Sequence, residues 1–341
     1  FITTSCSIMN SPLFTCIGNA CMDIVTSTDD EFLSRHNIEK SFCTHLKTED
    51  HLIDIKNSLD HYELIPGGAA ANTAHALSAL GSNTCFLAKI SDDNEGLTFL
   101  KNMKDVGVTS GMFEQRDTPL CTPQVLCFIT PDGDRTFASY NGVALDYGFE
   151  HMPEDLLDQT DILYLDGYTL CSSKIPDAFL KAAKIVHNRG GLTCLNVGDR
   201  SLIDMYKSTI RTLLDSCDGF ICNLAEAQAL YGHDKSTEEI TSIMKDEFIF
   251  GAITNGPEGA YIFHNGNIHF QPSDDISHIK NIDSIGAGDH FSAAILYGIA
   301  HDMPLDRIGR LANACAVDCL SHPGGRPLGG KDSLKHLAES V

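Results

Sequence analysis

Apolar runs alternate with amphipathic stretches along most of the 341 residues, and this rhythm limits the folds open to the chain. The runs have the length of buried strands, and the stretches between them have helical spacing. The expected strands are Leu13–Gly18, Thr84–Ile90, Ile162–Gly167, Leu192–Val197, Gly219–Cys222 and Ile249–Thr254. The expected helices are Ala69–Leu80, Glu95–Val106, Pro176–Arg189, Leu202–Leu214, Leu224–Tyr231, Gly286–Ala300 and Leu305–Ser321. Such alternation predicts a three-layer α/β fold, in which helices cover both faces of a mainly parallel sheet.

Two segments break this rhythm. Residues 40–64 and 120–140 are rich in strand-forming residues, and the second contains the turn Pro131-Asp132-Gly133. We expect both to form a small β-sheet lid, although an edge meander that covers the core would give the same pattern. The large α/β domain is then expected to comprise residues 13–39, 65–119 and 141–341. The Asn265-Gly266 pair within Tyr261–Phe270 predicts a hairpin.

Composition excludes several classes of partner. The formal net charge of −22 argues against binding to nucleic acid or to an anionic membrane. Since apolar runs stay shorter than about 18 residues, we expect a soluble, cytoplasmic protein. The 13 cysteines are scattered without a CxxC pair, which favours free thiols in a reducing compartment over a disulfide framework or a zinc site.

The stretch Asp283-Ser-Ile-Gly-Ala-Gly-Asp-His-Phe291 carries the strongest chemical signal. Gly286, Ala287 and Gly288 stand where a loop turns into a helix, so their N–H groups lack intrahelical partners and attract an anion. Asp289 in the same turn would repel that anion unless a hydroxyl proton lay between them. The layout therefore suits the deprotonation of an alcohol that attacks a phosphoryl group.

A second glycine-rich turn precedes the helix expected at residues 69–80. Gly67 and Gly68 would let a ligand approach the backbone closely, and Asn72 can both donate to and accept from vicinal hydroxyls. A tightly packed, alanine-rich helix without a ligand would show the same pattern.

Asn19 and Asp23 follow the first expected strand. Ligand groups collect at the carboxyl ends of strands in α/β sheets, so Asp23 could accept hydrogen bonds from a diol and Asn19 could contact a base or ring substituent. The alternative is a polar turn in which Asn19 is a local cap. Asn223 and Glu226 lie on one face of a first helical turn, where they could equally form an N-capping box.

The motifs at Asp283–Phe291 and Gly67–Gly81 resemble the two signatures of the ribokinase-like (PfkB) sugar and nucleoside kinases. The Asn19/Asp23 pattern and the tail Ser321–Pro327 are similar to the adenosine kinase-like branch. The resemblance implies a ribokinase-like fold and ATP-dependent phosphorylation of a primary 5′-hydroxyl, with adenosine as the expected acceptor. Asp289 would be the base, and residues 286–288 would form the anion hole.

The resemblance also implies roles for residues that are ambiguous by themselves. Asn223 and Glu226 would order Mg²⁺ through water. Residues expected to hold the nucleotide are Asn223, Glu226, Thr254, Gly256, Gly259 and Asn313. Arg135 would reach a phosphate when the lid closes, although an arginine at a solvated turn needs no ligand.

Two other functions stay open. A free sugar or sugar acid, such as ribose, fructose or 2-keto-3-deoxygluconate, could replace the nucleoside. A non-catalytic nucleoside- or sugar-binding relative would keep the fold, although the complete Gly-Ala-Gly-Asp sequence argues against it. The sequence also leaves open a monovalent cation near Asp283 and the choice between a monomer and a homodimer.

Overall fold

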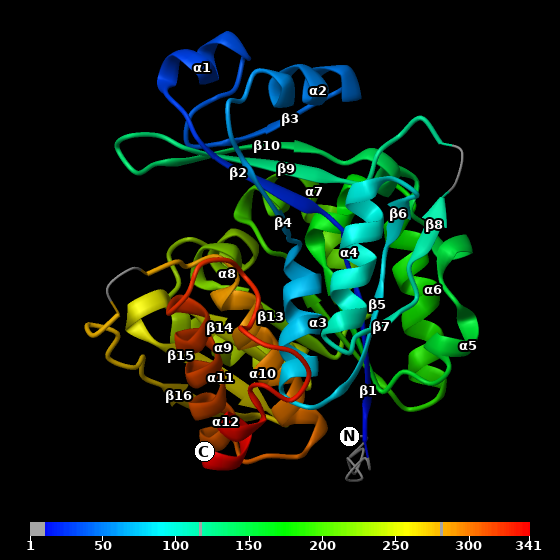
Figure 1. The fold of residues 1–341 in the computed structure, drawn as a ribbon. Coiled ribbons are helices and arrows are strands. Elements are labelled where there is room, and N and C mark those ends of the chain that lie inside the picture. The colour runs from blue at the N-terminus through cyan, green and yellow to red at the C-terminus, as the bar shows by residue number, and fades with distance from the viewer. Residues whose placement is uncertain (1–10, 116–117, 280–281) are drawn as a thin grey trace.

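A nine-stranded sheet forms the centre of the protein in the computed structural model, which describes residues 11–115, 118–279 and 282–341 (Figure 1). The strand order is β16-β15-β14-β13-β12-β11-β1-β5-β7. The bounds are β1 Leu13–Ile17, β5 Asn83–Leu87, β7 Thr109–Ser110, β11 Ile162–Asp166, β12 Leu192–Asn196, β13 Gly219–Asn223, β14 Phe250–Thr254, β15 Ala260–His264 and β16 Asn267–Gln271. The strands from β14 to β7 pair in parallel, and the β15–β16 hairpin adds two antiparallel edge strands.

Helices pack on both faces of this sheet around two large apolar clusters. One face carries α3 Ala69–Ala79, α4 Asn94–Asp105, α10 Ala287–Ala300, α11 Leu305–Leu320 and α12 Lys335–Ser340. The other carries α5 Glu154–Leu157, α6 Ile175–Asn188, α7 Arg200–Leu214, α8 Leu224–Tyr231 and α9 Thr237–Glu247. Short 3₁₀ helices occur at Gly142–Asp146, Phe149–His151, Gly167–Cys171 and Gly256–Glu258. The three-layer α/β prediction is therefore confirmed.

The apolar run Thr84–Ile90 does not form one strand as expected. It divides into β5 and β6 Lys89–Ser91, and β6 leaves the large sheet to pair with β8 Phe113–Gln115. Both pieces are buried from Thr84 onward, so the hydrophobic pattern continues across the break and does not mark it. The predicted hairpin is present, with Asn265 and Gly266 both at positive φ in its turn.

A separate five-stranded sheet has the order β3-β10-β9-β2-β4 and carries α1 Asp30–Arg35 and α2 Glu49–Asn57 on its outer face (Figure 1). Its strands are β2 Met22–Ser27, β3 Cys43–His45, β4 Glu63–Pro66, β9 Gln124–Ile129 and β10 Arg135–Tyr140. We call it the small sheet. It stands over the large sheet at the end opposite the C-terminus.

Two expectations about this region are wrong. Residues 40–64 are not mainly β, because α2 occupies their middle, where Thr48 caps the helix by accepting the His51 N–H. Residues 22–39 were expected in the large domain, yet β2 pairs with β9 and β4, and α1 packs on the same sheet. Residues 22–27 were not among the expected strands, and the sheet that β2 joins depends on distant partners.

Candidate active site

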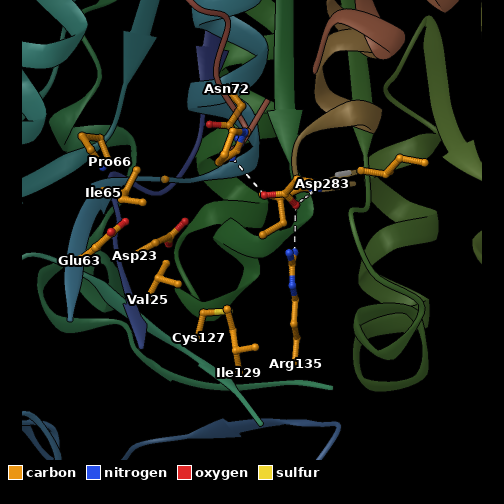
Figure 2. Close-up of a pocket in the computed structure, with 16 residues that line it drawn as sticks. Asp23, Val25, Glu63, Ile65, Pro66, Asn72, Cys127, Ile129, Arg135 and Asp283 are labelled. Atoms are coloured by element: carbon orange, nitrogen blue, oxygen red, sulfur yellow. Dashed lines mark hydrogen bonds and ion pairs between the residues drawn. The ribbon is translucent and has the colours of Figure 1, made fainter. Parts of the chain in front are cut away.

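A cavity of about 470 Å³ lies between the small sheet and the loops before α3 and α10 (Figure 2). The small sheet contributes mainly apolar side chains, together with three charged ones. These residues are Asp23, Val25, Glu63, Ile65, Pro66, Cys127, Ile129 and Arg135. The opposite wall consists of Gly67, Asn72, Ile282, Asp283, Ile285, Pro323, Gly324 and Gly325.

Helix α10 begins without a side-chain cap from any described residue. Gly286 is its N-cap, with a left-handed φ of 81°, and a Cβ there would lie 2.4 Å from the Gly325 Cα. The Ala287 N–H makes a long contact to the Ser284 carbonyl at 3.4 Å. By contrast, a Cβ on Gly288 would have no described atom within 4 Å. The first turn therefore presents backbone donors beside open space, which fits an anion.

Asp289 lies in that first turn and is held by another helix. Its Oδ2 accepts a hydrogen bond of 2.9 Å from the Asn72 amide of α3, and its carbonyl accepts one of 3.3 Å from the Thr73 hydroxyl. Burial raises the pKa of Asp289 to about 8, while the Asn72 hydrogen bond lowers it and the nearby Asp166 charge raises it. A carboxylate with this pKa is a stronger base than an exposed one.

Asp23, Gly67 and Asn72 face the same cavity. A Cβ on Gly67 would lie 2.2 Å from an Asp23 carboxylate oxygen, so glycine is needed for this close approach. Burial raises the pKa of Asp23 to about 7, and the positive charge of Arg326 opposes that rise. Asp23 belongs to β2 and not to the end of β1 as expected, but the fold still places it beside Asn72.

Asn19 and Gly68 lie behind this wall. The Asn19 amide donates to the Tyr168 carbonyl at 3.0 Å, and Asn19 is absent from the described cavity lining. Gly68 has a φ of 93°, and a Cβ there would lie 2.5 Å from the Asn19 carbonyl oxygen. In this structure both residues therefore fix the conformation of the turn before α3.

Arg135 lies at the cavity but is already paired. Its Nη1 lies 3.0 Å from Asp283 Oδ1, which ties β10 of the small sheet to the loop before α10 (Figure 2). Asp283 also accepts the N–H groups of Ile285 and Gly324, each at 3.1 Å. These bonds and the guanidinium hold the pKa of Asp283 below its usual range, against the effect of its burial.

Asn223 and Glu226 form a complete capping box at the start of α8. Asn223 Oδ1 accepts the Glu226 N–H at 2.9 Å, and the two Glu226 oxygens accept the Asn223 backbone N–H and side-chain amide at 3.2 and 2.7 Å. Glu226 is 2% exposed, and burial raises its pKa to about 7. The alternative capping role is thus present, and each Glu226 carboxylate oxygen already accepts one hydrogen bond within the box.

The remaining candidates lie near the ends of β14 and β16. Thr254 ends β14, and the turn after it is closed by an Asn255 N–H bond of 2.8 Å to the Gly259 carbonyl. Gly256 and Gly259 both have positive φ in this turn. Asn313 on α11 donates to the Pro272 carbonyl at 2.7 Å and so fixes the loop after β16.

Sequence reasoning missed two charged residues. Asp166, 2% exposed, accepts the N–H groups of Tyr168 at 2.9 Å and Ala70 at 3.3 Å, and burial raises its pKa to about 6. A carboxylate at the end of β11 before Gly167 was the available signal. Arg326 contacts Asn72 and Gly67, and its position within the tail Ser321–Pro327 was the signal there.

Among the described residues, no cluster of three or more His, Cys, Asp or Glu side chains could hold an ion. Asn223 is exposed at the end of β13 and offers an amide, a ligand type that suits Mg²⁺. The donor set therefore fits an ion held mainly by water and phosphate oxygens, which is how Mg²⁺ is usually bound in kinases.

The model of the PfkB family of carbohydrate kinases matches residues 44–328. The chain belongs to this family. A probable fructokinase-5 of Arabidopsis thaliana is 26% identical over 281 residues, covering 77% of this chain and 84% of that protein. An adenosine kinase structure from Sinorhizobium meliloti is 26% identical with a TM-score of 0.85, covering 97% of this chain and 99% of the other. A Schistosoma mansoni adenosine kinase with 2-fluoroadenosine, at 19% identity, 94% and 98% coverage and a TM-score of 0.81, shows the shared fold.

This PfkB-family chain is a phosphotransferase that acts on an alcohol, and its family implies the use of ATP. The ribokinase-like fold predicted from the sequence is confirmed. Sequence relatives include fructokinases, whereas structural neighbours include adenosine kinases, so the family does not fix the acceptor. In the described part of the chain, no helix is long and apolar enough to cross a membrane.

Proposed function

We propose that this PfkB-family kinase transfers the γ-phosphoryl group of ATP to the primary 5′-hydroxyl of a nucleoside, adenosine in particular, giving the monophosphate and ADP. One observation carries the proposal. Asp289 lies in the first turn of α10, which no described side chain caps, and is bonded to Asn72, which itself lines the cavity where an acceptor would fit. We infer that a base and an anion-binding turn adjoin an acceptor pocket through the bond between Asn72 and Asp289.

The acceptor would be held by groups from both sheets. Asp23 would accept hydrogen bonds from a vicinal diol, Asn72 would contact the same hydroxyls, and Gly67 and Gly68 would leave room for them. Asn19 would support this turn from behind. With the diol fixed, the primary hydroxyl would be directed toward Asp289.

Asp289 would remove the proton from the hydroxyl as its oxygen attacks the γ-phosphorus, and the bond to the ADP oxygen would break. The N–H groups of Gly286, Ala287, Gly288 and Asp289 would stabilise the negative charge on the transferring group. Because Asn72 donates to Asp289, it would favour the ionised form of the base at the moment it is needed.

The nucleotide would lie along the ends of β13 and β14. Thr254, Gly256, Gly259 and Asn313 would border it. Mg²⁺, held through water near Asn223 and Glu226, would supply positive charge that balances the phosphates. Arg135 would exchange Asp283 for a phosphate oxygen when the small sheet closes as a lid over the cavity and excludes water.

The cavity walls favour a nucleoside over a free sugar. Val25, Ile65 and Ile129 of the small sheet, with Ile282 and Ile285 opposite, give the pocket a largely apolar lining. A base has two apolar faces to bury against such walls, whereas a free sugar is edged with hydroxyls on all sides. The structural likeness to an adenosine kinase over nearly the whole chain supports the same choice.

A free sugar is the second candidate, because fructokinases are among the sequence relatives and the cavity also holds Asp23, Glu63 and Asn72. The test is a coupled assay of ADP release with Mg·ATP across adenosine, other nucleosides, ribose, fructose and 2-keto-3-deoxygluconate. We expect turnover with adenosine. Turnover with fructose alone would overturn the nucleoside assignment, and binding without any turnover would favour a non-catalytic relative.

A further inference from the structure

The guanidinium of Arg326 connects three elements at the back of the acceptor pocket. Its Nε donates to Asn72 Oδ1 at 3.3 Å, its Nη2 donates to the Gly67 carbonyl at 2.9 Å, and its Nη1 donates to Asn102 Oδ1 of α4. The guanidinium carbon also lies 5.1 Å from the centroid of the Phe99 ring. A planar fork with several donors suits such a junction, whereas a single ammonium group does not.

These contacts decide which way the Asn72 amide points. An amide has a donor end and an acceptor end, and exchanging them would reverse every hydrogen bond that it makes. Since Arg326 can only donate, it fixes Oδ1 on its own side and leaves Nδ2 directed at Asp289 Oδ2, 2.9 Å away. If the amide turned over, its oxygen would face the carboxylate and repel it.

The tail that carries Arg326 is packed into the same place. A Cβ on Gly325 would lie 2.6 Å from Asn72 Nδ2, and a Cβ on Gly286 would lie 2.4 Å from Gly325 Cα. Gly324 donates its N–H to Asp283. The loop at residues 323–326 therefore lies between the start of α10 and Asn72, and Arg326 completes its attachment.

We propose that Arg326 is a positioning residue for phosphoryl transfer, which sets the orientation of the Asn72 amide and through it the position and ionisation of Asp289. This inference rests on the proposed role of Asp289 as the base. Through Gly67 the same guanidinium also supports the turn beside Asp23, and its positive charge favours the ionised form of that acid. Arg326 thereby acts on both acids without needing to touch the acceptor.

Other titratable groups also face Asp289. Asp166 and Tyr164 on β11, Tyr168 just beyond that strand, and Cys319 on α11 interact with it electrostatically. The Asp166 charge raises the pKa of Asp289, while the hydrogen bond from Asn72 lowers it. Loss of a correctly oriented Asn72 amide should therefore leave Asp289 harder to ionise.

The test compares Arg326→Lys with the wild type, using whichever acceptor the wild type phosphorylates best. The variant keeps the charge but loses the fork, so we expect kcat to fall about 10- to 100-fold. The acid limb of its pH–kcat profile should move to higher pH. Arg211→Lys is the matched control, because Arg211 also lies over an aromatic ring, Tyr231, and donates to a backbone carbonyl, but at the α7–α8 contact.

A double-mutant cycle tests whether Arg326 acts on Asp289 through Asn72. In an Asn72→Ala background, Arg326→Lys should reduce kcat by less than about threefold, because the amide through which it acts is gone. An Arg326→Lys protein that unfolds at lower temperature but keeps the wild-type kcat and pH profile would overturn the positioning role. Equal effects in both backgrounds would overturn the route through Asn72. A wild type that phosphorylates no acceptor would instead refute the proposed function.

Discussion

Two helices of this kinase begin near the ends of the central strands, and their first turns are capped differently. Helix α8 has a full capping box, in which Asn223 and Glu226 satisfy each other's donors and acceptors. Helix α10 begins with Gly286 at positive φ, without a side-chain cap from the described residues, and its acid bonds to Asn72 on α3. Each helix has an acid in its first turn. Glu226 takes part in the capping box of its own helix, whereas Asp289 bonds to a different helix.

If Asp289 is the base, the partner of an acid, and not its place in a helix, decides whether it stabilises the fold or serves chemistry. Glu226 accepts the backbone N–H of Asn223, and Asn223 Oδ1 in turn accepts the N–H of Glu226, so an anion finds fewer free donors there. Asp289 accepts from a neighbouring helix, so the N–H groups of α10 stay available for a phosphate. This difference yields predictions that can be ranked by the size of their effect.

The largest effect is expected for Asp289→Asn. Removal of the proton acceptor should lower kcat at least about 10²-fold while acceptor binding changes little, because the amide keeps the shape of the side chain. Steady-state ADP release and acceptor titration by calorimetry would measure the two quantities. Asp306→Asn is the matched control, because Asp306 also lies in a first helical turn, that of α11, and bonds to Arg310 of the same helix. Retained turnover in Asp289→Asn would contradict the assignment of the base.

A smaller effect is expected for Gly288→Ala. The added methyl group enters space that is open in this structure, and alanine favours a helix over glycine by about 1 kcal/mol, so folding should not suffer. If a phosphate occupies that space, kcat/KM for ATP should fall by about tenfold. The measurement is kcat/KM for ATP together with the thermal midpoint. An unchanged kcat/KM would mean that the phosphoryl group lies elsewhere.

Asn223→Ala should separate stability from catalysis at α8. Loss of an N-cap costs about 1 kcal/mol, which urea unfolding would detect. Because Asn223 is also proposed to hold Mg²⁺ through water, KM for Mg·ATP should rise by more than about threefold, and additional Mg²⁺ should reduce the increase. A KM within about threefold of the wild type would mean that Asn223 serves the fold alone.

The smallest effect concerns stability against pH. The pKa of Asp289 is about 8 in the folded protein, above its ordinary 3.8, so the folded state binds this proton more tightly than the unfolded chain does. Its contribution to stability is therefore present below pH 3.8 and is lost as pH rises toward 8. Asp289→Asn should melt a few degrees above the wild type at pH 8, with a gap that narrows toward pH 4. A gap independent of pH would contradict this linkage.

The sequence predicted the layers, the hairpin and the order of the central elements, because these depend on local periodicity. It also placed Asp289, Asn72 and Gly67 in one site through motifs in which glycines permit close contacts. It could not assign β2 to the small sheet, since that strand's partners lie about 40 and 100 residues further along the chain. Nor did it predict α2. Most residues of this helix are polar and only two of its side chains, Leu52 and Ile55, are buried, so its apolar periodicity is weak.

The charged residues Asp166 and Arg326 were harder to predict than the residues of the two glycine-rich motifs. Asp166 and Arg326 act through hydrogen bonds to groups that are distant in sequence, including Ala70 and Asn72. Arg135 was expected at a phosphate, and in this structure it pairs with Asp283. Such pairings depend on how α3, the small sheet and the C-terminal tail pack together, and a local sequence pattern does not predict that packing.

The apolar wall of the cavity also indicates which substitutions could change the preferred acceptor. Val25, Ile65 and Ile129 stand on β2, β4 and β9, three short segments separated by dozens of residues. A change of acceptor could arise from a few scattered substitutions while every signature around Asp289 stayed the same. Similarity measured over the whole chain therefore does not fix the acceptor.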